Sequence, residues 1–464
     1  MGDFVTMPSL SFFRLPVVWG CALLAAPQGA LAQSNGLSLG QAALEAPGEG
    51  FHLSVASRVR YETIENTPRT LVSPSENWWS FRTNLAASWQ SGPIRLAAEL
   101  TDSRVYGEHP GSVLTSNDVN AFEPTQLYLS ANLGAALGRG SSVKLTAGRM
   151  ALNLGSRRLI AADDYRNAAN TYTGVRVDAS AGRLAATAIY MLPLARLPDD
   201  PYGVSGNRVD LDKESLSTIL WGGLVHHASG PEVSFYHFRE RDWPGHATRD
   251  RDLNTAGLRF YRGPRAGHLD GEVEAMYQWG HESASILPTA ARLEASATFV
   301  HAHVGYTLAH RWHPRVALEF DRASGDGPGA TYGRFDTLYG MRRGDFAPAG
   351  LYAAVGRANI ASPAVRVEAA PSQQTDLSFT WRPMWLADWH DSFSNTSVRD
   401  SSGRSGDFAG HQFDLRLRAW LIPRHVRAEW DGLILAKGRF LTTAPNAPKD
   451  GDTGYTSLSV TVVF

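Results

Sequence analysis

Apolar and polar side chains alternate with a period of two residues along most of this chain. In "FHLSVASRVRY", Phe51, Leu53 and Val55 share one face, and residues 315–321 and 411–421 show the same pattern. Strict alternation is typical of strands with one buried face, whereas the 3.6-residue period of an amphipathic helix is nearly absent. A soluble sandwich also alternates, but its strands are shorter. Strands of about 9 to 11 residues along the whole chain favour an antiparallel barrel that spans a membrane.

The connections between the strands support this all-β fold class. The links after even-numbered strands are short and turn-like, as in "SGP" at Ser91, whereas most of those after odd-numbered strands are long and polar, as in Met150 to Thr173. Short periplasmic turns and long extracellular loops are typical of bacterial outer-membrane barrels, which have an even number of strands. We predict about eighteen strands, near residues 51–63, 79–90, 94–101, 126–133, 142–149, 174–179, 183–192, 217–226, 232–239, 253–261, 269–280, 292–308, 315–321, 364–369, 374–381, 410–421, 425–433 and 455–464.

The two ends of the chain indicate the outer membrane of a Gram-negative bacterium. An apolar tract follows Arg14 and ends in Ala30-Leu31-Ala32, which is typical of a secretory cleavage site. We therefore predict a signal peptide over residues 1–32 and a barrel over residues 33–464. The only cysteine, Cys21, lies in the signal peptide, so the mature chain would hold no disulfide and no thiolate metal site. The final strand ends on Phe464 and resembles the C-terminal strand of outer-membrane barrel proteins.

A barrel of about eighteen strands is too wide for side chains to fill and leaves an aqueous lumen. A charge that faces lipid costs about 2–4 kcal/mol near the midplane, so the charged strand faces are expected to point inward. The lumen lining could be a set of mutually paired charges that keeps the barrel rigid and wet. Alternatively, some arginines stay available for a passing anion, since the guanidinium fork suits a carboxylate. On each strand, the residues that alternate with the apolar, lipid-facing ones are expected to face the lumen. The basic residues among them include Arg58, Arg60, Arg82, Arg95, Lys144, Arg176, Arg315, Arg366, Arg416, Arg418 and Arg427, and the acidic ones include Glu99, Glu272, Glu274, Glu294, Glu319, Glu368, Asp414, Glu429 and Asp431.

One stretch is unusually rich in arginine. The segment "GRMALNLGSRRLIAADDYRNAANTYTGVRVD", residues 148–178, carries five arginines in a chain whose formal net charge is only -1. It runs from a strand end through a long loop into the next strand. Asp163, Asp164 and Asp178 lie in the same stretch, so the arginines either bind an anion or pair with these carboxylates. The candidate pore-lining residues here are Arg149, Arg157, Arg158, Arg166 and Arg176.

The same stretch, with "QLYLSANL" before it and "LEFDRASGDGPGATYGRFDTLYG", "GLYAAVGRANI" and "AKGRFL" after it, resembles the alginate export family of outer-membrane proteins. The resemblance extends over roughly residues 51–464. It implies a monomeric eighteen-stranded barrel that passes a polyanionic polysaccharide outward through an electropositive constriction partly covered by loops. It places Arg149, Arg158, Arg166 and Arg176 nearest that constriction and Arg357 and Arg366 opposite, with Asp163 and Asp164 holding some of the arginines in place.

We therefore predict a passive outer-membrane channel that exports an anionic, alginate-like polysaccharide through an arginine-lined pore. The alternative is a general or anion-preferring porin for small solutes, which many members of this superfamily resemble. No nucleophile elbow, phosphate-binding loop or dinucleotide fingerprint occurs in a suitable context, so we expect neither an enzyme nor a cofactor. The expected partners are outer-membrane lipid and lipopolysaccharide, the anionic polysaccharide or small anionic solutes, and periplasmic export proteins; no nucleic acid is expected.

His301 and His303 lie on one face of a predicted strand and could bind zinc or copper if a third ligand approached them. The sequence identifies no such ligand, and lumen-facing histidines need no metal. We therefore expect no metal site.

Overall fold

The computed structural model describes residues 43–109, 111–346, 348 and 350–464. The predicted signal peptide, residues 1–32, lies outside the described residues. Over these described ranges the regular structure comprises two short helices, α1 (Pro201–Ser205) and α2 (Arg439–Thr443), and nineteen strands. Within the described ranges, no helix is long and apolar enough to cross a membrane. The strands are β1 (Gly50–Glu65), β2 (Glu76–Ser91), β3 (Ile94–Tyr106), β4 (Asn120–Gly134), β5 (Ser141–Met150), β6 (Tyr172–Ala181), β7 (Leu184–Pro193), β8 (Thr218–His227), β9 (Pro231–Glu240), β10 (Asp252–Arg262), β11 (Leu269–Ser283), β12 (Arg292–Thr307), β13 (Arg315–Ala323), β14 (Thr331–Tyr332), β15 (Ile360–Ser372), β16 (Thr375–Trp385), β17 (Phe408–Ile422), β18 (Val426–Lys437) and β19 (Thr453–Val463).

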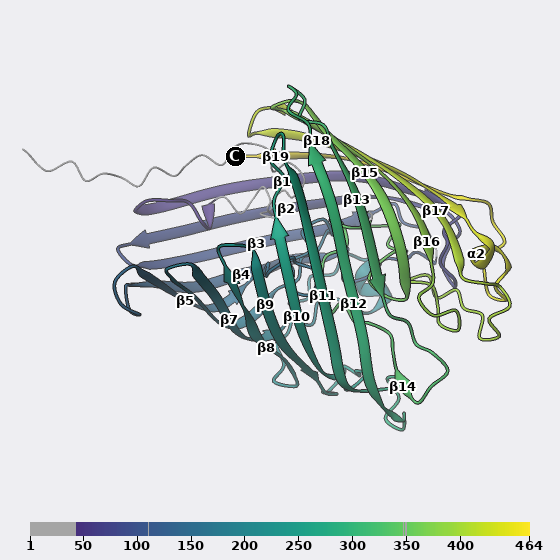
Figure 1. Cartoon of the computed structure of the whole chain (residues 1–464). Coiled ribbons are helices and arrows are strands. Elements are labelled where there is room, and N and C mark those ends of the chain that lie inside the picture. Colours follow the sequence, from purple (N-terminus) through teal and green to yellow (C-terminus); the bar gives the residue numbers. More distant parts are fainter. Residues whose placement is uncertain (1–42, 110, 347, 349) are drawn as a thin grey trace, which may run out of the picture.

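The strands form one closed antiparallel barrel. Each long strand pairs with its neighbours in chain order, and β1 pairs with both β2 and β19, so the sheet has no free edge (Figure 1). The two-residue strand β14 lies in a loop and pairs in parallel with β12, outside the antiparallel wall. The wall therefore has eighteen strands, which confirms the predicted fold class.

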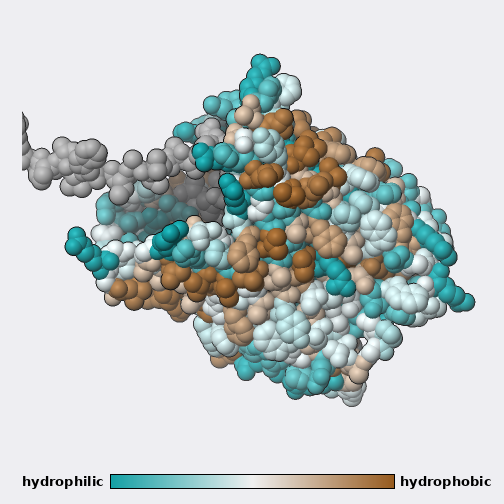
Figure 2. Space-filling model, viewed as in Figure 1, coloured by the Kyte–Doolittle hydropathy of each residue, from teal (hydrophilic) through white to brown (hydrophobic). Residues whose placement is uncertain are grey.

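The two faces of the strands differ as the alternation predicts, except that Glu294 of β12, which was expected to face the lumen, is exposed on the outer face near the strand end. On β2, Trp79, Phe81 and Leu85 are exposed on the outside, whereas Arg82 and Asn84 between them are buried on the lumen side. Figure 2 shows hydrophobic residues in a band across the strands of the visible face, with hydrophilic residues towards both ends. An apolar outer belt of this kind is what a barrel needs in order to sit in lipid.

The loop lengths alternate between the two ends of the barrel. Short turns follow β2, β4, β6, β8, β10, β12, β15 and β17, and the connections after the other strands are longer. The longest connections cover residues 151–171, 194–217, 324–359 and 386–407. This asymmetry is typical of short periplasmic turns and long extracellular loops.

Several of the long loops contribute buried side chains to an apolar core inside the barrel. Buried side chains from residues 151–171, 324–359 and 386–407 belong to one cluster that includes Leu152, Ile160, Phe335, Tyr352 and Phe393. The cluster also includes Tyr172, Phe238 and Phe299 from the wall. The loops therefore fill part of the lumen, and the remaining free space lies beside them.

Candidate functional site

A cavity of about 420 Å³ lies inside the barrel, next to the inward-folded loops. Thirteen arginines and only five carboxylates line it, although the whole chain is nearly neutral. Carboxylates that lie behind this lining, among them Asp270, Glu272 and Asp376, pair with several of these arginines and offset part of the positive charge. The lining arginines are Arg58, Arg60, Arg82, Arg157, Arg158, Arg259, Arg315, Arg343, Arg357, Arg366, Arg416, Arg418 and Arg427, and the carboxylates are Asp163, Asp164, Glu319, Asp345 and Glu429.

The cavity extends from the inward loops towards the end of the barrel with short turns. Residues 153–165 and 341–345 form one side of it, and Pro264 in the β10–β11 turn and Thr461 near the end of β19 line the other. The wall between them is contributed by β1, β2, β10, β12, β13, β15, β17, β18 and β19. A solute that moves along the barrel axis from the short-turn side therefore meets the arginine-rich wall before it meets the loops.

Asp345 ties two of the inward loops together. Its carboxylate accepts hydrogen bonds from Arg158 at 2.9 and 3.0 Å and also pairs with Arg357. Its backbone carbonyl accepts hydrogen bonds from Arg366 and Arg382 of the wall at 3.2 and 2.9 Å. Burial alone would raise the pKa of Asp345, but the charges of Arg158 and Arg357 hold it well below its ordinary value. The carboxylate is therefore ionised at any physiological pH.

The guanidinium group of Arg158 pairs with three carboxylates. Besides Asp345, its guanidinium donates to Glu272 at 2.5 Å and to Glu274 at 2.7 Å, both on β11. Burial lowers the pKa of Arg158, but the three carboxylates outweigh it and raise the pKa well above its ordinary value. Because all its charge is compensated within the protein, Arg158 anchors loop 151–171 to the wall.

The backbones of the two loops also meet directly. Ile160 and Tyr339 form a parallel bridge, and Met341 donates its N–H to the carbonyl of Arg157 at 3.0 Å. The approach is so close that a Cβ on Gly340 would collide with the carbonyl oxygen of Arg158. A residue without a side chain is therefore required at position 340.

The opposite end of loop 151–171 is held by basic residues of β1 and β2. Arg82 donates to the carboxylate of Asp164 at 2.8 Å, and Arg58 donates to backbone carbonyls of residues 164–166 at 3.0–3.4 Å. The guanidinium groups of Arg60 and Arg343 both lie over the ring of Tyr165, at 4.0 and 4.4 Å from its centroid. Contacts of this kind stabilise a cation without neutralising it.

Several wall arginines are only weakly paired. The nearest carboxylate contacts of Arg60, Arg416 and Arg427 measure 3.9, 3.6 and 3.8 Å, which exceeds a direct hydrogen bond. Among the described residues, the Nε atoms of these three arginines have no hydrogen-bond partner. Arg416 and Arg427 also keep 17% and 25% of their side chains exposed to the lumen. Arg416 and Arg427 therefore present weakly paired guanidinium groups to the lumen.

The structure brings six of the nine residues proposed from the sequence to this cavity: Arg157, Arg158, Arg357, Arg366, Asp163 and Asp164. The other three lie elsewhere. Arg149 reaches Glu123 and, at 2.7 Å, Glu214. Arg166 pairs with Asp163 at 2.6 Å, and Arg176 pairs with Asp178 at 2.8 Å.

Other lining residues were not among those candidates. Arg58, Arg60, Arg82, Arg416, Arg418 and Arg427 were predicted to face the lumen from strand parity, but nothing in the sequence indicated that they converge. Arg343 lies in loop 324–359, where parity gives no guidance. Among the described residues, one group of three potential metal ligands lies on the wall, formed by Glu272, His301 and His303.

The chain matches the profile of the family described as alginate export over residues 52–451. The chain belongs to the alginate export family. No curated protein sequence matches it. The family and the closed barrel together establish an outer-membrane channel, and they agree with the resemblance seen in the sequence.

Solved structures of Occ proteins share the fold of this alginate export family member at low sequence identity. The crystal structure of Pseudomonas aeruginosa OccD3 (OpdP) has a TM-score of 0.54 at 14% identity, covering 90% of this chain and 91% of that chain. OccK8 (OprE) of the same organism gives 0.54 at 13% identity, with 89% and 98% covered. Acinetobacter baumannii OccAB1 gives 0.55 at 12% identity, with 91% and 99% covered. These similarities concern the fold alone.

Proposed function

We propose that this channel conducts carboxylate-bearing saccharides passively across the outer membrane, and that its substrate is an anionic, alginate-like polysaccharide on its way out of the cell. The observation that carries the proposal is the excess of arginine in the cavity, thirteen against five carboxylates. A uronate chain carries one carboxylate per sugar, and a guanidinium binds a carboxylate through two parallel hydrogen bonds.

The ion pairs divide these arginines into two groups, one that holds the loops in place and one that remains available to a solute. Arg158 and Arg357 are committed to Asp345 and hold the loops, whereas Arg416 and Arg427 keep weakly paired guanidinium groups exposed to the lumen. Weak pairing suits transport, because a solute has to leave each site as readily as it enters. Direction would come from polymer synthesis or from a periplasmic partner, since a passive channel supplies no energy.

A channel for small anions is the second candidate, favoured by the size of the free space. A cavity of about 420 Å³ lies within the range of pockets for single small ligands. The loops that limit it are fixed to each other and to the wall by buried ion pairs. A polymer would therefore have to pass in single file through this space.

Planar-bilayer recordings with uronate oligomers separate the two candidates. Polymer transport predicts current block whose duration increases with oligomer length and decreases in the Arg416→Gln/Arg427→Gln double variant. The matched control is Arg208→Gln, since Arg208 lies in a long loop with half of its side chain exposed. Conduction of small anions without block by any oligomer would reject polymer transport and favour the small-anion channel.

A further inference from the structure

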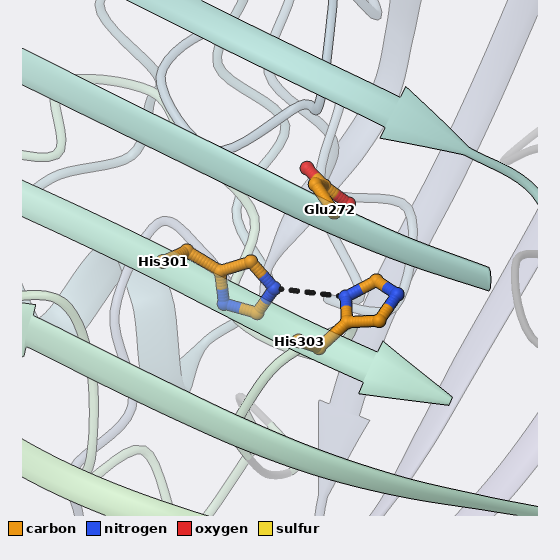
Figure 3. Close-up of side chains that lie close together, drawn as sticks. All are labelled: Glu272, His301 and His303. Carbon is orange, nitrogen blue, oxygen red and sulfur yellow. Dashed lines mark hydrogen bonds between the residues drawn. The ribbon is translucent and has the colours of Figure 1, made fainter. Parts of the chain in front are cut away.

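Glu272, His301 and His303 meet on the inner wall of the barrel, at the border of the cavity. Glu272 on β11 lies directly opposite His303 on β12, and His301 is the next residue on the same face of β12. One potential ligand atom from each of the three residues lies within 4.8 Å of the other two (Figure 3). Glu272 and His301 are each 2% exposed, so this group is largely shielded from solvent.

The two imidazole rings point one nitrogen at each other. His301 Nε2 lies 3.3 Å from His303 Nδ1, as the dashed line in Figure 3 shows. Two nitrogen ligands at about 2.0–2.1 Å from a tetrahedral metal ion are about 3.3–3.4 Å apart. The spacing of the two nitrogens therefore already matches that of two ligands on one ion.

Neighbouring carboxylates determine which nitrogens carry the protons. His301 Nδ1 lies 2.7 Å from Asp321, and His303 Nε2 lies 3.5 Å from Asp270. An ionised carboxylate only accepts hydrogen bonds, so His301 Nδ1 is the N–H donor to Asp321, and a proton on His303 Nε2 would face Asp270. If both rings are neutral, their inner nitrogens face each other with lone pairs, and a shared proton or a bound metal ion would compensate them. Carboxylates that orient metal-binding histidines in this way are a regular feature of metal sites.

The two carboxylate oxygens of Glu272 differ in their hydrogen bonding. Its Oε1 accepts from Arg158 at 2.5 Å and from Arg259 at 2.8 Å. Its Oε2 is buried and has no hydrogen-bond partner among the described residues. An unsatisfied buried carboxylate oxygen is costly unless a ligand such as a cation compensates it.

We propose that Glu272, His301 and His303 bind one transition-metal ion of the zinc, copper or nickel class. Two imidazoles and a carboxylate suit these ions, and three protein ligands leave at least one coordination position open. Since His301 and His303 both line the cavity, a bound ion would lie beside the lumen. The ion would add a fixed positive centre to the arginine-rich wall. This site does not depend on the identity of the transported solute.

Metal binding to the intact barrel, purified without a histidine tag and stripped with a chelator, tests the proposal. Zn²⁺ affinity is measured by competition with a chromophoric chelator, and Co²⁺ is used as a spectroscopic probe of tetrahedral coordination. We expect one Zn²⁺ per chain and visible ligand-field bands with Co²⁺. The variants Glu272→Gln, His301→Gln and His303→Gln should lose the bands, and Asp321→Asn should weaken Zn²⁺ binding roughly 10- to 100-fold.

The control is His226→Gln. The alternation along β8 places His226 on the lumen face of the barrel as well, and it lies opposite Glu232. It should bind Zn²⁺ as the unmodified protein does. The shift in gel mobility on heating, measured for every variant, separates loss of the metal from loss of the fold. Two results would overturn the proposal. The first is a barrel that retains no Zn²⁺ and gives no Co²⁺ bands, which would mean that the histidines share a proton. The second is equal loss of binding in His226→Gln and in His303→Gln.

Discussion

The guanidinium of Arg158 lies 2.9 Å from the carboxylate of Asp345, a residue 187 positions further along the chain, and this contact joins two loops. Both loops lie inside the barrel, and β11 supplies two further carboxylates to the same arginine. This buried group of charges therefore contributes to the position of the loops, together with the backbone bridge between Ile160 and Tyr339 and the contacts of Arg58 and Arg82.

Removal of the Arg158 side chain charge should loosen the loops. In Arg158→Gln, three carboxylates lose their common partner, and loss of one partner of a buried pair typically costs about 3–5 kcal/mol. We expect larger fluctuations of the single-channel current and faster proteolysis within residues 324–359. The control Arg208→Gln should change neither, since exposed pairs contribute at most about 1 kcal/mol. Unchanged current noise in Arg158→Gln would show that the loops are held by other contacts.

The same contact predicts how the loops respond to acid. The pKa of Asp345 is lower in the folded protein than its ordinary value of about 3.8. Its contribution to loop stability is therefore complete above that value and is lost only as the pH falls well below it. Current noise should be the same at pH 7 and pH 5 and should rise only below about pH 4. In Asp345→Asn the noise should be high at every pH, and an increase between pH 7 and pH 5 in the unmodified protein would contradict this assignment.

The outer face of β2 gives a test of the membrane orientation. Leu85 is 43% exposed near the middle of the strand, so Leu85→Arg should destabilise the barrel in lipid vesicles by about 2–4 kcal/mol. Ser459→Arg serves as the matched control, because Ser459 lines the cavity and its substituted side chain would remain in the lumen. Denaturant unfolding in vesicles measures both changes. A larger loss for Ser459→Arg than for Leu85→Arg would reverse the assignment of the two faces.

The wall of the barrel could be predicted from the sequence because each strand carries its own alternation. All eighteen predicted strands overlap the strands of the antiparallel wall. The parity of β1 also placed Arg58 and Arg60 on the lumen side, where both line the cavity. The local pattern is sufficient for this because a single shift of register would send charges into lipid. Only β14 was missed, since a two-residue strand carries no periodicity.

The interior could not be predicted in the same way. Arg158 looked like a residue available to an anion, but its partners Glu272, Glu274 and Asp345 are far from it in the chain. The third potential metal ligand beside His301 and His303 likewise comes from the neighbouring strand. Inward-folded loops follow no period, and the pairing of their charges depends on tertiary contacts that one sequence does not reveal.

The ion selectivity of the purified channel is the most direct test of an anion pathway along the arginine-rich wall. In a planar bilayer with a tenfold gradient of KCl, the reversal potential of the unmodified protein should have the sign of an anion-selective pore. In the Arg416→Gln/Arg427→Gln variant it should shift towards zero, because two weakly paired lumen arginines have lost their charge. A cation-selective reversal potential, or one that the double variant leaves unchanged, would contradict an anion pathway along this arginine wall.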